Sequence, residues 1–588
     1  MLAGKDTLAI LPTGGGKSLT YQIPALLLDG VTVVVSPLIS LMKDQVDQLG
    51  QNGVLAATLN SSQDPSTHEH NRRLLLDGRA KILYAAPESL LAGKAASLLD
   101  QLQVRLLTID EAHCISEWGH DFRPEYRQLA RLRAKLPNAA VLALTATATL
   151  PVRQDIARQL KVNPANILVG GFGRPNLRVA VLPKHNPIRQ AIGVIGSDPA
   201  RTGIIYCFSR KNTEEVAQQL NQAGISALPY HAGLDDAQRQ AAQEAFARDD
   251  VRVIVATIAF GMGINKSNVR FVIHYDLPKS IEGYYQEIGR AGRDGLDSDC
   301  VLLYSPADAN SIRFINNQKP AAEQRKAEQL LAGMLQYAET THLCRHHQLL
   351  AYFGEQSAGQ NCQQCDVCRD GPTTQADITI LAQKYLSASL RTEGRFSATH
   401  LINILRGEPS QAVLRWGHNE LKTFGIGKEL NESQWRAVAR QLVAQGLVAE
   451  QGEYRQVAVT PKGRQTLDAR QTILGNDPHT AASPKRARAN PSASTQQVYF
   501  GQYDTLLFEL LRQERKQLAA NAGVPPFVIF SDKTLTEMAS SFPTSMAAFR
   551  KVGGVGEYKA NQYGPRFIEV IRQYQQQHPQ AKAGAKKK

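Results

Sequence analysis

The chain has few cysteines and no long apolar run, and each absence excludes a class of protein. Cysteine accounts for 7 of the 588 residues, and three of these, Cys114, Cys207 and Cys300, stand alone. So few cysteines exclude the disulfide framework of a small secreted scaffold and indicate a reducing compartment. No run of about 18 apolar residues occurs, so no membrane-spanning helix is predicted. The first residues lead directly into a glycine-rich loop and do not resemble a signal peptide.

Negative charge is in deficit. The chain has 67 Lys and Arg residues against 53 Asp and Glu residues, which gives a formal net charge of +14. An excess of positive charge is informative about binding partners and not about the fold. Nucleic acid is the first candidate partner and an acidic membrane surface is the second.

The first half of the chain has the pattern of an α/β protein. Short apolar runs rich in β-branched residues begin at Val31, Val104, Gly203 and Val251, and helical stretches separate them. Fully apolar runs of this kind predict buried parallel strands. The alternation pauses over residues 160–180 and then resumes. We therefore expect two α/β domains in series, followed by smaller, mainly helical domains.

A glycine-rich loop follows the first predicted strand. The segment LPTGGGKS, Leu11–Ser18, comes after the strand TLAIL and before a helical pattern. This order is typical of a phosphate-binding loop, in which Thr13, Gly14, Gly15 and Gly16 would turn their N–H groups towards phosphate oxygens. Lys17 would reach the β- and γ-phosphates of ATP, and the Ser18 hydroxyl would bind Mg²⁺. Leu11 stands where the usual loop has glycine, so this is a variant form, and an ordinary glycine-rich turn is the alternative.

Two further segments complete a candidate ATP site. Asp110 and Glu111 follow the apolar strand VRLLTI, where Asp110 would hold Mg²⁺ and Glu111 would polarise the attacking water. Arg290 and Arg293 lie three residues apart, so on a helix they would share a face. If that face meets the γ-phosphate across a cleft, ATP lies between the two α/β domains and its hydrolysis opens and closes the cleft. A chance acidic pair and a solvated basic helix turn are the alternatives.

The remaining four cysteines form a metal-binding pattern. Cys362, Cys365 and Cys368 are spaced as CxxCxxC, and Cys344 lies upstream. Four thiolates suit tetrahedral Zn²⁺ in a structural role, because no coordination position is left open for water. An iron–sulfur cluster is the alternative, but no Cys-Pro follows the run.

Other segments resemble helicase motifs. PLISLMKDQ from Pro37, LTATAT from Leu144 and VATIAFGMGINK from Val255 are similar to motifs of superfamily 2 helicases. The segment CISEWGHDFRPEY, which begins at Cys114, resembles the aromatic-rich loop of the RecQ family of DNA helicases. FGRPN from Phe172, the cysteine segment, and the final segments VPPFVIFSDKTL and VGGVGEYKANQYG also resemble that family. The resemblance covers nearly the whole chain and is to a bacterial member with one HRDC domain.

The resemblance implies a domain order. It consists of a first RecA-like motor domain (1–170), a second RecA-like motor domain (171–308), a helical zinc-binding domain (309–372), a winged-helix domain (373–470), a linker (471–499), an all-helical HRDC-like domain (500–576) and a basic tail (577–588). It also places His113 and Gly263 at the nucleotide. The cofactors implied are ATP, Mg²⁺ and Zn²⁺.

The resemblance also implies an activity and partners. A RecQ-like chain would be an ATP-dependent 3′-to-5′ DNA helicase that moves along single-stranded DNA and unwinds duplex DNA in repair, recombination and replication, including the SOS response. Its partners would be single-stranded and duplex DNA, together with single-stranded-DNA-binding protein and recombination proteins, and no membrane. It would act as a monomer in a bacterial cytoplasm, at the nucleoid.

The aromatic-rich loop supplies the first predicted DNA contacts. In the family this loop senses single-stranded DNA and relays its presence to the ATP site. Trp118 and Phe122 offer stacking faces, and His120 and Arg123 offer polar contacts. Aromatic residues buried in the core are the alternative.

Two later segments supply further predicted DNA contacts. The run from Leu447 predicts a strand, a tight turn and a second strand. In the RecQ family a hairpin in this domain can wedge duplex strands apart, and the resemblance implies that Tyr454 near the tip stacks on the terminal base pair. An ordinary hairpin surface is the alternative. In the HRDC-like domain, Phe527 and Lys559 are candidates for binding single strands, although Phe527 also suits a core position.

One departure from the family pattern concerns the start of the chain. The family has a segment before the phosphate loop, with an aromatic-and-glutamine motif that reads adenine, and here only ten residues precede Leu11. We expect a truncated chain with weaker adenine discrimination. A non-catalytic or impaired DNA-binding motor is therefore one alternative function, and an RNA helicase, which shares the DEAH tetrapeptide, is another.

Overall fold

The computed structural model describes residues 1–579, except for 38, 61–62, 92–93, 120, 262–265, 357–360, 372–374, 452–455 and 479–502. These residues form two compact units. One unit holds two parallel sheets and the C-terminal helical domain, and the other holds a helical domain with two small strand pairs. No helix among the described residues combines the length and the apolar character needed to cross a membrane.

The first sheet is parallel throughout and has the strand order β3-β4-β2-β5-β6-β1-β7. Its strands are β1 (Thr7–Ile10), β2 (Val31–Val35), β3 (Ala56–Leu59), β4 (Ile82–Ala85), β5 (Val104–Ile109), β6 (Ala140–Thr145) and β7 (Ile167–Val169). Every residue of β2, β4 and β6 is buried, as the continuous apolar runs predict for strands covered on both faces.

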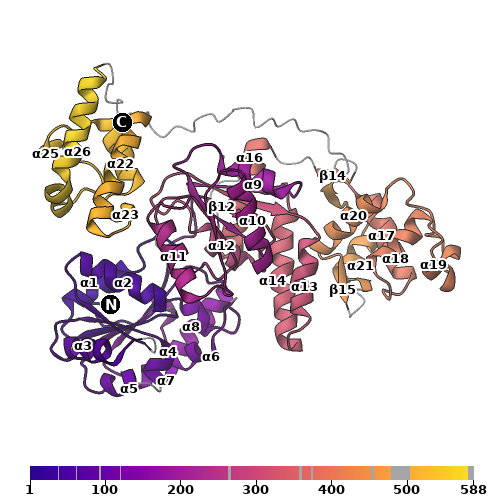
Figure 1. Ribbon diagram of the computed structural model, residues 1–588. Helices are drawn as coiled ribbons and strands as arrows, with labels where there is room; N and C mark the ends of the chain where they lie inside the picture. The colour runs from indigo at the N-terminus through magenta and orange to yellow at the C-terminus, as the bar shows by residue number, and fades with distance from the viewer. Residues whose placement is uncertain are drawn as a thin grey trace. The chain divides into compact units, whose positions relative to one another are not determined.

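Helices cover both faces of this sheet (Figure 1). They are α1 (Leu19–Leu27), α2 (Ile39–Gln51), α3 (Pro65–Leu76), α4 (Pro87–Leu91), α5 (Lys94–Leu99), α6 (Pro124–Arg127), α7 (Leu129–Lys135) and α8 (Leu150–Leu160). The connections that contain α1 and α2 lead towards the β3 edge of the sheet. The connections that contain α3 to α8 lead in the opposite direction, towards the β7 edge. Since such crossovers are right-handed, α1 and α2 lie on the face opposite the later helices.

The second sheet is also parallel, with the order β10-β11-β9-β12-β13-β8. Its strands are β8 (Leu177–Pro183), β9 (Thr202–Tyr206), β10 (Ala227–Tyr230), β11 (Val253–Ala256), β12 (Val269–His274) and β13 (Ser298–Tyr304). Its helices are α9 (Pro187–Ile195), α10 (Arg210–Gln222), α11 (Asp236–Ala247), α12 (Ile281–Ile288) and α13 (Asp308–Asn316). The expectation of two α/β domains in series is confirmed. The chain leaves the first sheet after β7 and enters the second at β8.

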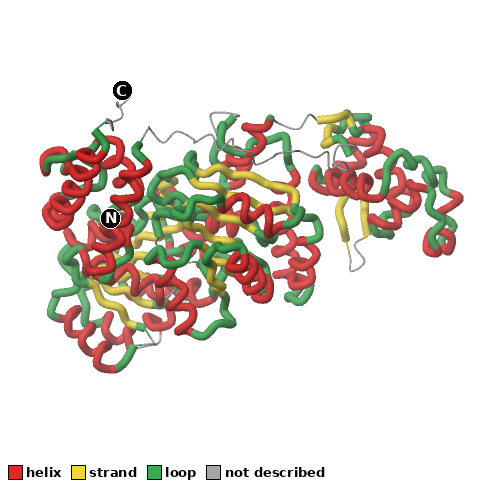
Figure 2. Tube along the Cα trace, turned by 45° about the horizontal axis from the view of Figure 1, so that its top comes forward, coloured by secondary structure: helices red, strands yellow, loops and turns green. Residues whose placement is uncertain are grey.

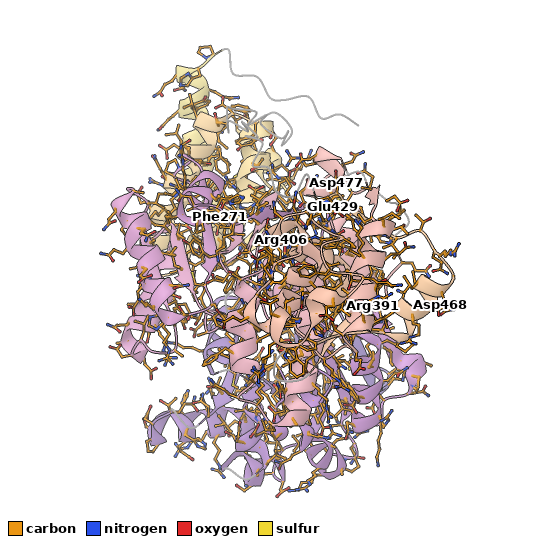
Figure 3. The ribbon with its side chains drawn as sticks, turned by 90° about the vertical axis from the view of Figure 1, so that its right-hand side faces the viewer. Phe271, Arg391, Arg406, Glu429, Asp468 and Asp477 are labelled. Atoms are coloured by element: carbon orange, nitrogen blue, oxygen red, sulfur yellow. The ribbon has the colours of Figure 1, made fainter. Side chains whose placement is uncertain are left out.

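The parallel arrangement decides where functional loops gather. All strands of a parallel sheet end at the same edge, so the loops after β1, β5 and β6 lie at one edge of the first sheet. The loops after β9, β11 and β12 gather in the same way in the second sheet. Close packing fixes these strands. A Cβ atom on Gly203 of β9 would lie 2.2 Å from the ring of Phe271 on β12, which is labelled in Figure 3.

Three helices surround the cysteine-rich segment: α14 (Ala321–Glu339), α15 (Arg345–Tyr352) and α16 (Asp366–Asp370). α15 packs against the link between the two sheets. The Phe353 ring stacks on Phe172 with centroids 4.7 Å apart, and the Glu355 carboxylate accepts a hydrogen bond of 2.6 Å from the Phe172 N–H. The residues after α15 therefore pack against the link through which the chain passes from the first sheet to the second.

The helical domain of the second unit contains α17 (Thr379–Arg391), α18 (Ala398–Arg406), α19 (Gln411–Arg415), α20 (Glu432–Ala444) and α21 (Pro461–Asp468). Trp435 lies fully buried at its core and donates a 2.7 Å hydrogen bond to the Gly427 carbonyl. The predicted hairpin is present as β15 (Val448–Gln451) and β16 (Gln456–Val459), and it projects from the helices (Figure 2). A second pair, β14 (Gln375–Asp377) and β17 (Leu474–Asn476), was not expected from the sequence.

The C-terminal domain is all-helical, as its periodicity predicts. It consists of α22 (Thr505–Ala522), α23 (Pro526–Ile529), α24 (Asp532–Ser541), α25 (Met546–Phe549) and α26 (Glu557–Gln577). Phe530, Phe549 and Phe567 form the centre of its core. Arg515 is also buried there and pairs with Asp532 at 2.8 Å, so its charge is neutralised inside the domain.

Candidate functional site

The predicted phosphate loop is a tight turn between β1 and α1. Gly14 and Gly16 have φ angles of +81° and +78°, in the region that favours glycine. At Gly15 a Cβ atom would lie 2.9 Å from the Pro12 carbonyl oxygen. All three glycines are therefore required by the backbone. Ser18 precedes α1 without a side-chain capping bond, so its hydroxyl is not used to cap the helix.

A cavity of about 500 Å³ opens over this loop. Residues of the first motor sheet and of the second both line it. From the predicted site the lining residues are Thr13, Gly14, Gly16, Lys17, Ser18, Asp110, Glu111, Arg290 and Arg293. Gln22, two α2 residues, Gln45 and Gln48, and Asn52 directly after α2 also line it, and the sequence analysis did not identify them. The fold thus brings together three segments that are far apart in the chain.

Two carboxylates follow β5 and face Lys17. Burial, together with the neighbouring Glu111 carboxylate, raises the pKa of Asp110 to about 6, while the Lys17 ammonium group opposes that shift. Glu111 has φ +48° and ψ +45°, a left-handed conformation that costs on the order of 1 kcal/mol for a residue other than glycine. Two crowded carboxylates in a buried position form the kind of oxygen-rich donor set that a divalent cation stabilises.

His113 connects these carboxylates to the next strand. It is only 1% exposed, in a short 3₁₀ helix, η1 (Ala112–Ile115). Its Nδ1 atom lies 3.0 Å from the Thr145 hydroxyl at the end of β6 and 3.3 Å from Oε2 of Glu111. Two residues further on, the Thr147 hydroxyl accepts a 3.3 Å hydrogen bond from Gln286 of α12. A chain of polar contacts thus runs from the carboxylates to the second motor domain.

Arg290 and Arg293 lie in turns after α12 and not on a helix, so the prediction of a shared helix face is wrong. α12 ends at Ile288, and Gly292 adopts φ +57°. Both arginines nevertheless reach the cavity. Arg290 donates to the Gly261 carbonyl, and the Arg293 side chain lies 3.6 Å from the position of a Cβ atom on Gly14.

The arginines form a crowded positive cluster. Burial, reinforced by the charges of Arg290 and Arg174, lowers the pKa of Arg293 to about 9. Guanidinium groups held close together out of water repel one another, and a bound polyphosphate would relieve that repulsion. The electrostatics of the cavity therefore favour an anionic ligand.

Arg174 is a site residue that the sequence analysis missed. One of its terminal nitrogens donates to the carbonyls of Thr13 at 2.9 Å and Gly289 at 3.2 Å. The other donates to the carbonyls of Ala291 at 2.8 Å and Gly292 at 3.1 Å. One guanidinium group thus joins the phosphate loop to the segment that carries the two arginines. The FGRPN resemblance identified this segment but not the role of its arginine.

Changing Arg174 to lysine should weaken catalysis without unfolding the chain. A lysine ammonium group lacks the planar fork that serves four carbonyls, and the loss of two such bonds at roughly 0.5–1.5 kcal/mol each predicts a fall in kcat/KM for ATP of about tenfold. The change is checked by steady-state ATPase assays of R174K. The matched control is R178K on β8, whose ion pair with Asp299 lies outside the cavity lining. Equal ATPase losses in both variants would argue against the bridging role.

The aromatic-rich loop presents one of its rings to solvent. Trp118 is 65% exposed, so it is not a core aromatic, whereas Phe122 is half-buried. Arg123 pairs with Asp121 at 3.2 Å and donates to the Pro37 carbonyl at 3.3 Å. His120 lies outside the described residues.

The backbone of this loop is held from two sides. A Cβ atom on Gly119 would lie 2.6 Å from the His113 carbonyl oxygen, so the turn requires glycine. Lys326 of α14 donates to the carbonyls of Glu117 and Gly119, the latter at 2.6 Å. Lys326 was not found in the sequence analysis, because its partners are backbone atoms distant in the chain. These two bonds order the backbone at Glu117 and Gly119, while Trp118 remains accessible.

The four predicted zinc-ligand sulfurs come together. The Sγ atoms of Cys344, Cys362, Cys365 and Cys368 all lie within 4.8 Å of one another. Zn–S bonds of about 2.3 Å in a tetrahedron place sulfurs nearly 4 Å apart, so the group fits zinc. Backbone N–H groups of Gln364 and Cys365 point at the Cys362 sulfur, at 3.4 and 3.3 Å, and would stabilise a thiolate.

The other predicted DNA contacts are less well defined. Tyr454 and Gly263 lie outside the described residues. Phe527 is half-buried, and Lys559 donates a 2.6 Å hydrogen bond to the Val528 carbonyl. Burial lowers the pKa of Lys559.

Five family models match the chain. They are DEAD/DEAH box helicase (residues 1–156), Helicase conserved C-terminal domain (186–295), RecQ zinc-binding (306–369), RQC domain (372–483) and HRDC domain (504–571). Together they cover most of the chain, and the zinc-binding model includes all four clustered cysteines.

Curated relatives match along almost the full length. A protein of Pasteurella multocida named ATP-dependent DNA helicase RecQ is 44% identical over 97% of this chain and 90% of its own length. Its namesake in Haemophilus influenzae is 44% identical over 97% of this chain and 92% of its own. The Bacillus subtilis protein of the same name is 41% identical over 97% of this chain and 94% of its own length.

Proposed function

Because the chain belongs to the RecQ family of ATP-dependent DNA helicases, we propose that it hydrolyses ATP to move 3′ to 5′ along single-stranded DNA and to unwind duplex DNA. The observation that carries this proposal is the cavity that Lys17, Asp110 and Arg293 line together. These residues come from both α/β domains, so a nucleotide bound there contacts both domains. Its hydrolysis therefore changes the attraction between the two domains and lets the cleft open and close.

Each lining residue has a role in this proposal. Backbone N–H groups of Thr13, Gly14 and Gly16 hold phosphate oxygens, and Lys17 neutralises the β- and γ-phosphates. The Gly15 N–H donates to the Pro12 carbonyl at 2.9 Å and holds the turn. Glu111 orients the attacking water and accepts its proton. Arg290 and Arg293 bind the charge that develops on the γ-phosphate as the bond to the leaving oxygen breaks. His113 holds Glu111 in place through its Nδ1 contact.

The oxygen donors at this edge suit Mg²⁺. The Ser18 hydroxyl and the Asp110 carboxylate are hard ligands in the cavity lining. A divalent cation would offset the burial and the Glu111 charge that together raise the pKa of Asp110. A bound Mg²⁺ ion would supply charge neutralisation between the β- and γ-phosphates.

DNA sensing is assigned to the aromatic-rich loop. Trp118 would stack on a base of the single strand, and Phe122, His120 and Arg123 would line the same path. The loop begins at Cys114, directly after His113, so a shift of the loop on binding DNA reaches Glu111 through that histidine. DNA would in this way stimulate hydrolysis.

The wider role follows from the family. We assign the chain to DNA repair, recombination and replication in a bacterial cytoplasm, where it acts as a monomer at the nucleoid. Single-stranded-DNA-binding protein and recombination proteins would be its partners, and Phe527 and Lys559 would add weak contacts to single strands.

The hairpin β15–β16 is proposed as the strand-separating wedge, with Tyr454 at its tip. Y454A should reduce duplex unwinding by about tenfold, because the stacking of one base on an aromatic ring is worth roughly 1–3 kcal/mol, while DNA-stimulated ATPase activity stays near the wild-type rate. The two activities are measured on the same tailed duplex. Y503A, which changes a tyrosine of the C-terminal domain, is the matched control. Equal losses of unwinding and ATPase activity in Y454A would exclude a wedge role.

The choice of polynucleotide separates this proposal from an RNA helicase. We expect single-stranded DNA to stimulate ATP hydrolysis at least tenfold more than RNA of the same length and sequence. The experiment compares initial ATPase rates at saturating polynucleotide and fixed salt, since binding to phosphates depends on salt. Equal stimulation by RNA would favour the RNA helicase alternative. Neither the match to full-length relatives nor the described geometry of the cavity supports an impaired motor.

A further inference from the structure

A second group of metal-binding atoms lies beside the nucleotide site. Nε2 of His113, Sγ of Cys114 and a carboxylate oxygen of Asp121 all lie within 4.8 Å of one another. The sulfur lies 3.7 Å from Nε2 of His113 and 3.8 Å from Oδ2 of Asp121. Ligand atoms at about 2.0–2.3 Å from a tetrahedral zinc ion lie roughly 3.5 Å apart. The two separations from the sulfur are therefore close to those between ligands in a coordination tetrahedron, and the third pair of atoms lies within 4.8 Å.

The fold, and not the sequence spacing alone, creates this group. His113 and Cys114 lie in η1 and are 1% and 0% exposed, whereas Asp121 lies on the aromatic-rich loop and is partly exposed. The loop returns to η1 through a 3.0 Å hydrogen bond from the Arg123 N–H to the Cys114 carbonyl. That return places the Asp121 carboxylate next to the thiol.

The surroundings of His113 suit a metal ligand. Its Nδ1 atom faces the Thr145 hydroxyl and the Glu111 carboxylate, so Nε2 is the ring nitrogen turned towards Cys114. Histidines that bind metals usually donate their other ring nitrogen to a carboxylate or another oxygen, which fixes the ring orientation. Glu111 and Thr145 already provide this outer support.

We propose that His113, Cys114 and Asp121 form a second binding site for zinc or a similar borderline divalent cation, and that the bound ion inhibits DNA-stimulated ATP hydrolysis. One imidazole, one thiolate and one carboxylate leave a fourth position for water. The inhibition rests on the proposed function, since the ion would tie the aromatic-rich loop to the histidine that contacts Glu111. A loop held in this way cannot shift when DNA binds.

Competing interactions make this site weaker than the four-cysteine cluster. Burial raises the pKa of the Cys114 thiol, and against burial the neighbouring Cys114 and Glu111 raise the pKa of His113 to about 10. A cation therefore has to displace a proton from each of these two side chains. The Arg123 guanidinium group pairs with Asp121 at 3.2 Å and has to move aside. A route from solvent exists, because Asp121 and Arg123 line a second cavity of about 490 Å³. Occupancy would thus rise and fall with the concentration of free zinc, which suits regulation.

Counting bound ions tests the site itself. Purified wild-type protein is equilibrated with increasing free Zn²⁺, and bound zinc per chain is measured after gel filtration in the same free-zinc buffer. We expect the wild type to rise from one ion to two, and both C114A and D121N to remain at one. The matched control C300A removes another buried, single cysteine and should still bind two. Identical zinc counts in the wild type, C114A and D121N would overturn the proposal.

Activity measurements test the consequence. The DNA-stimulated ATPase rate of each protein is divided by its own rate without zinc. We expect added Zn²⁺ to inhibit the wild type and C300A at least fivefold, with recovery after a zinc chelator that leaves Mg²⁺ in solution, and to leave C114A and D121N above half their zinc-free rates. Equal inhibition of all four proteins would overturn the regulatory role. If the wild type shows no ATPase activity at all, the proposed function fails, while the zinc count still decides the site.

Discussion

K17A is expected to lose ATP hydrolysis and strand separation almost completely while keeping its fold. Lys17 lines the cavity between the motor sheets, and its charge is the main force that lowers the pKa of Asp110 against burial. Removing the ammonium group takes away the partner of the β- and γ-phosphates and leaves Asp110 more readily protonated. We expect the ATPase rate to fall on the order of a thousandfold, which corresponds to about 4 kcal/mol of transition-state stabilisation.

The measurement is the steady-state ATPase rate of K17A at saturating single-stranded DNA. K135A is the matched control, because Lys135 ends α7 in the same domain and is exposed outside the cavity lining. The control should keep the wild-type rate. A K17A rate within tenfold of the wild type would mean that the glycine-rich loop does not hold the phosphates.

R293A is expected to show the second-largest effect. Arg293 lies against the phosphate loop near Gly14, and burial lowers its pKa to about 9 in a cluster of like charges. An arginine that meets the γ-phosphate in this way is worth on the order of a thousandfold in rate. R290A should lose less, since the Arg290 guanidinium group already donates to the Gly261 carbonyl.

Stability separates this catalytic role from a structural one. Because Arg293 is crowded by Arg290 and Arg174, its removal relieves repulsion, and the Tm of R293A without ATP should equal or exceed that of the wild type. ATPase rates and thermal unfolding are measured on R293A and on R189A, a control on an exposed residue of α9. A large fall in the Tm of R293A, or a near-normal ATPase rate, would contradict the assignment.

Much of this site could be predicted from local sequence. The three glycines before Lys17 are required by the backbone of one turn, and Asp110 follows a buried strand, so their pattern is a direct result of local geometry. The four cysteines are similar, since CxxCxxC places three thiols within reach of one ion. The two α/β domains could likewise be predicted from the apolar runs, two of which correspond to β2 and β5.

Other features depend on contacts that no local pattern reveals. Arg174 donates to backbone carbonyls of Thr13, Gly289, Ala291 and Gly292, and Lys326 donates to those of the aromatic-rich loop. Every residue has a backbone carbonyl, so the sequence does not indicate which carbonyls accept these hydrogen bonds. The spacing of Arg290 and Arg293 suggested a helix, but Gly289 caps α12 and the turns carry both side chains instead.

The most direct test of the central claim, that ATP cleavage between the two motor sheets drives unwinding, is a strand-displacement assay on a duplex with a 3′ single-stranded tail. We predict that the wild type separates the strands with ATP but not with a non-hydrolysable ATP analogue, that a duplex with only a 5′ tail stays intact, and that K17A and R293A separate neither. Strand separation by R293A at the wild-type rate, or equal separation of the 5′-tailed duplex, would contradict the account.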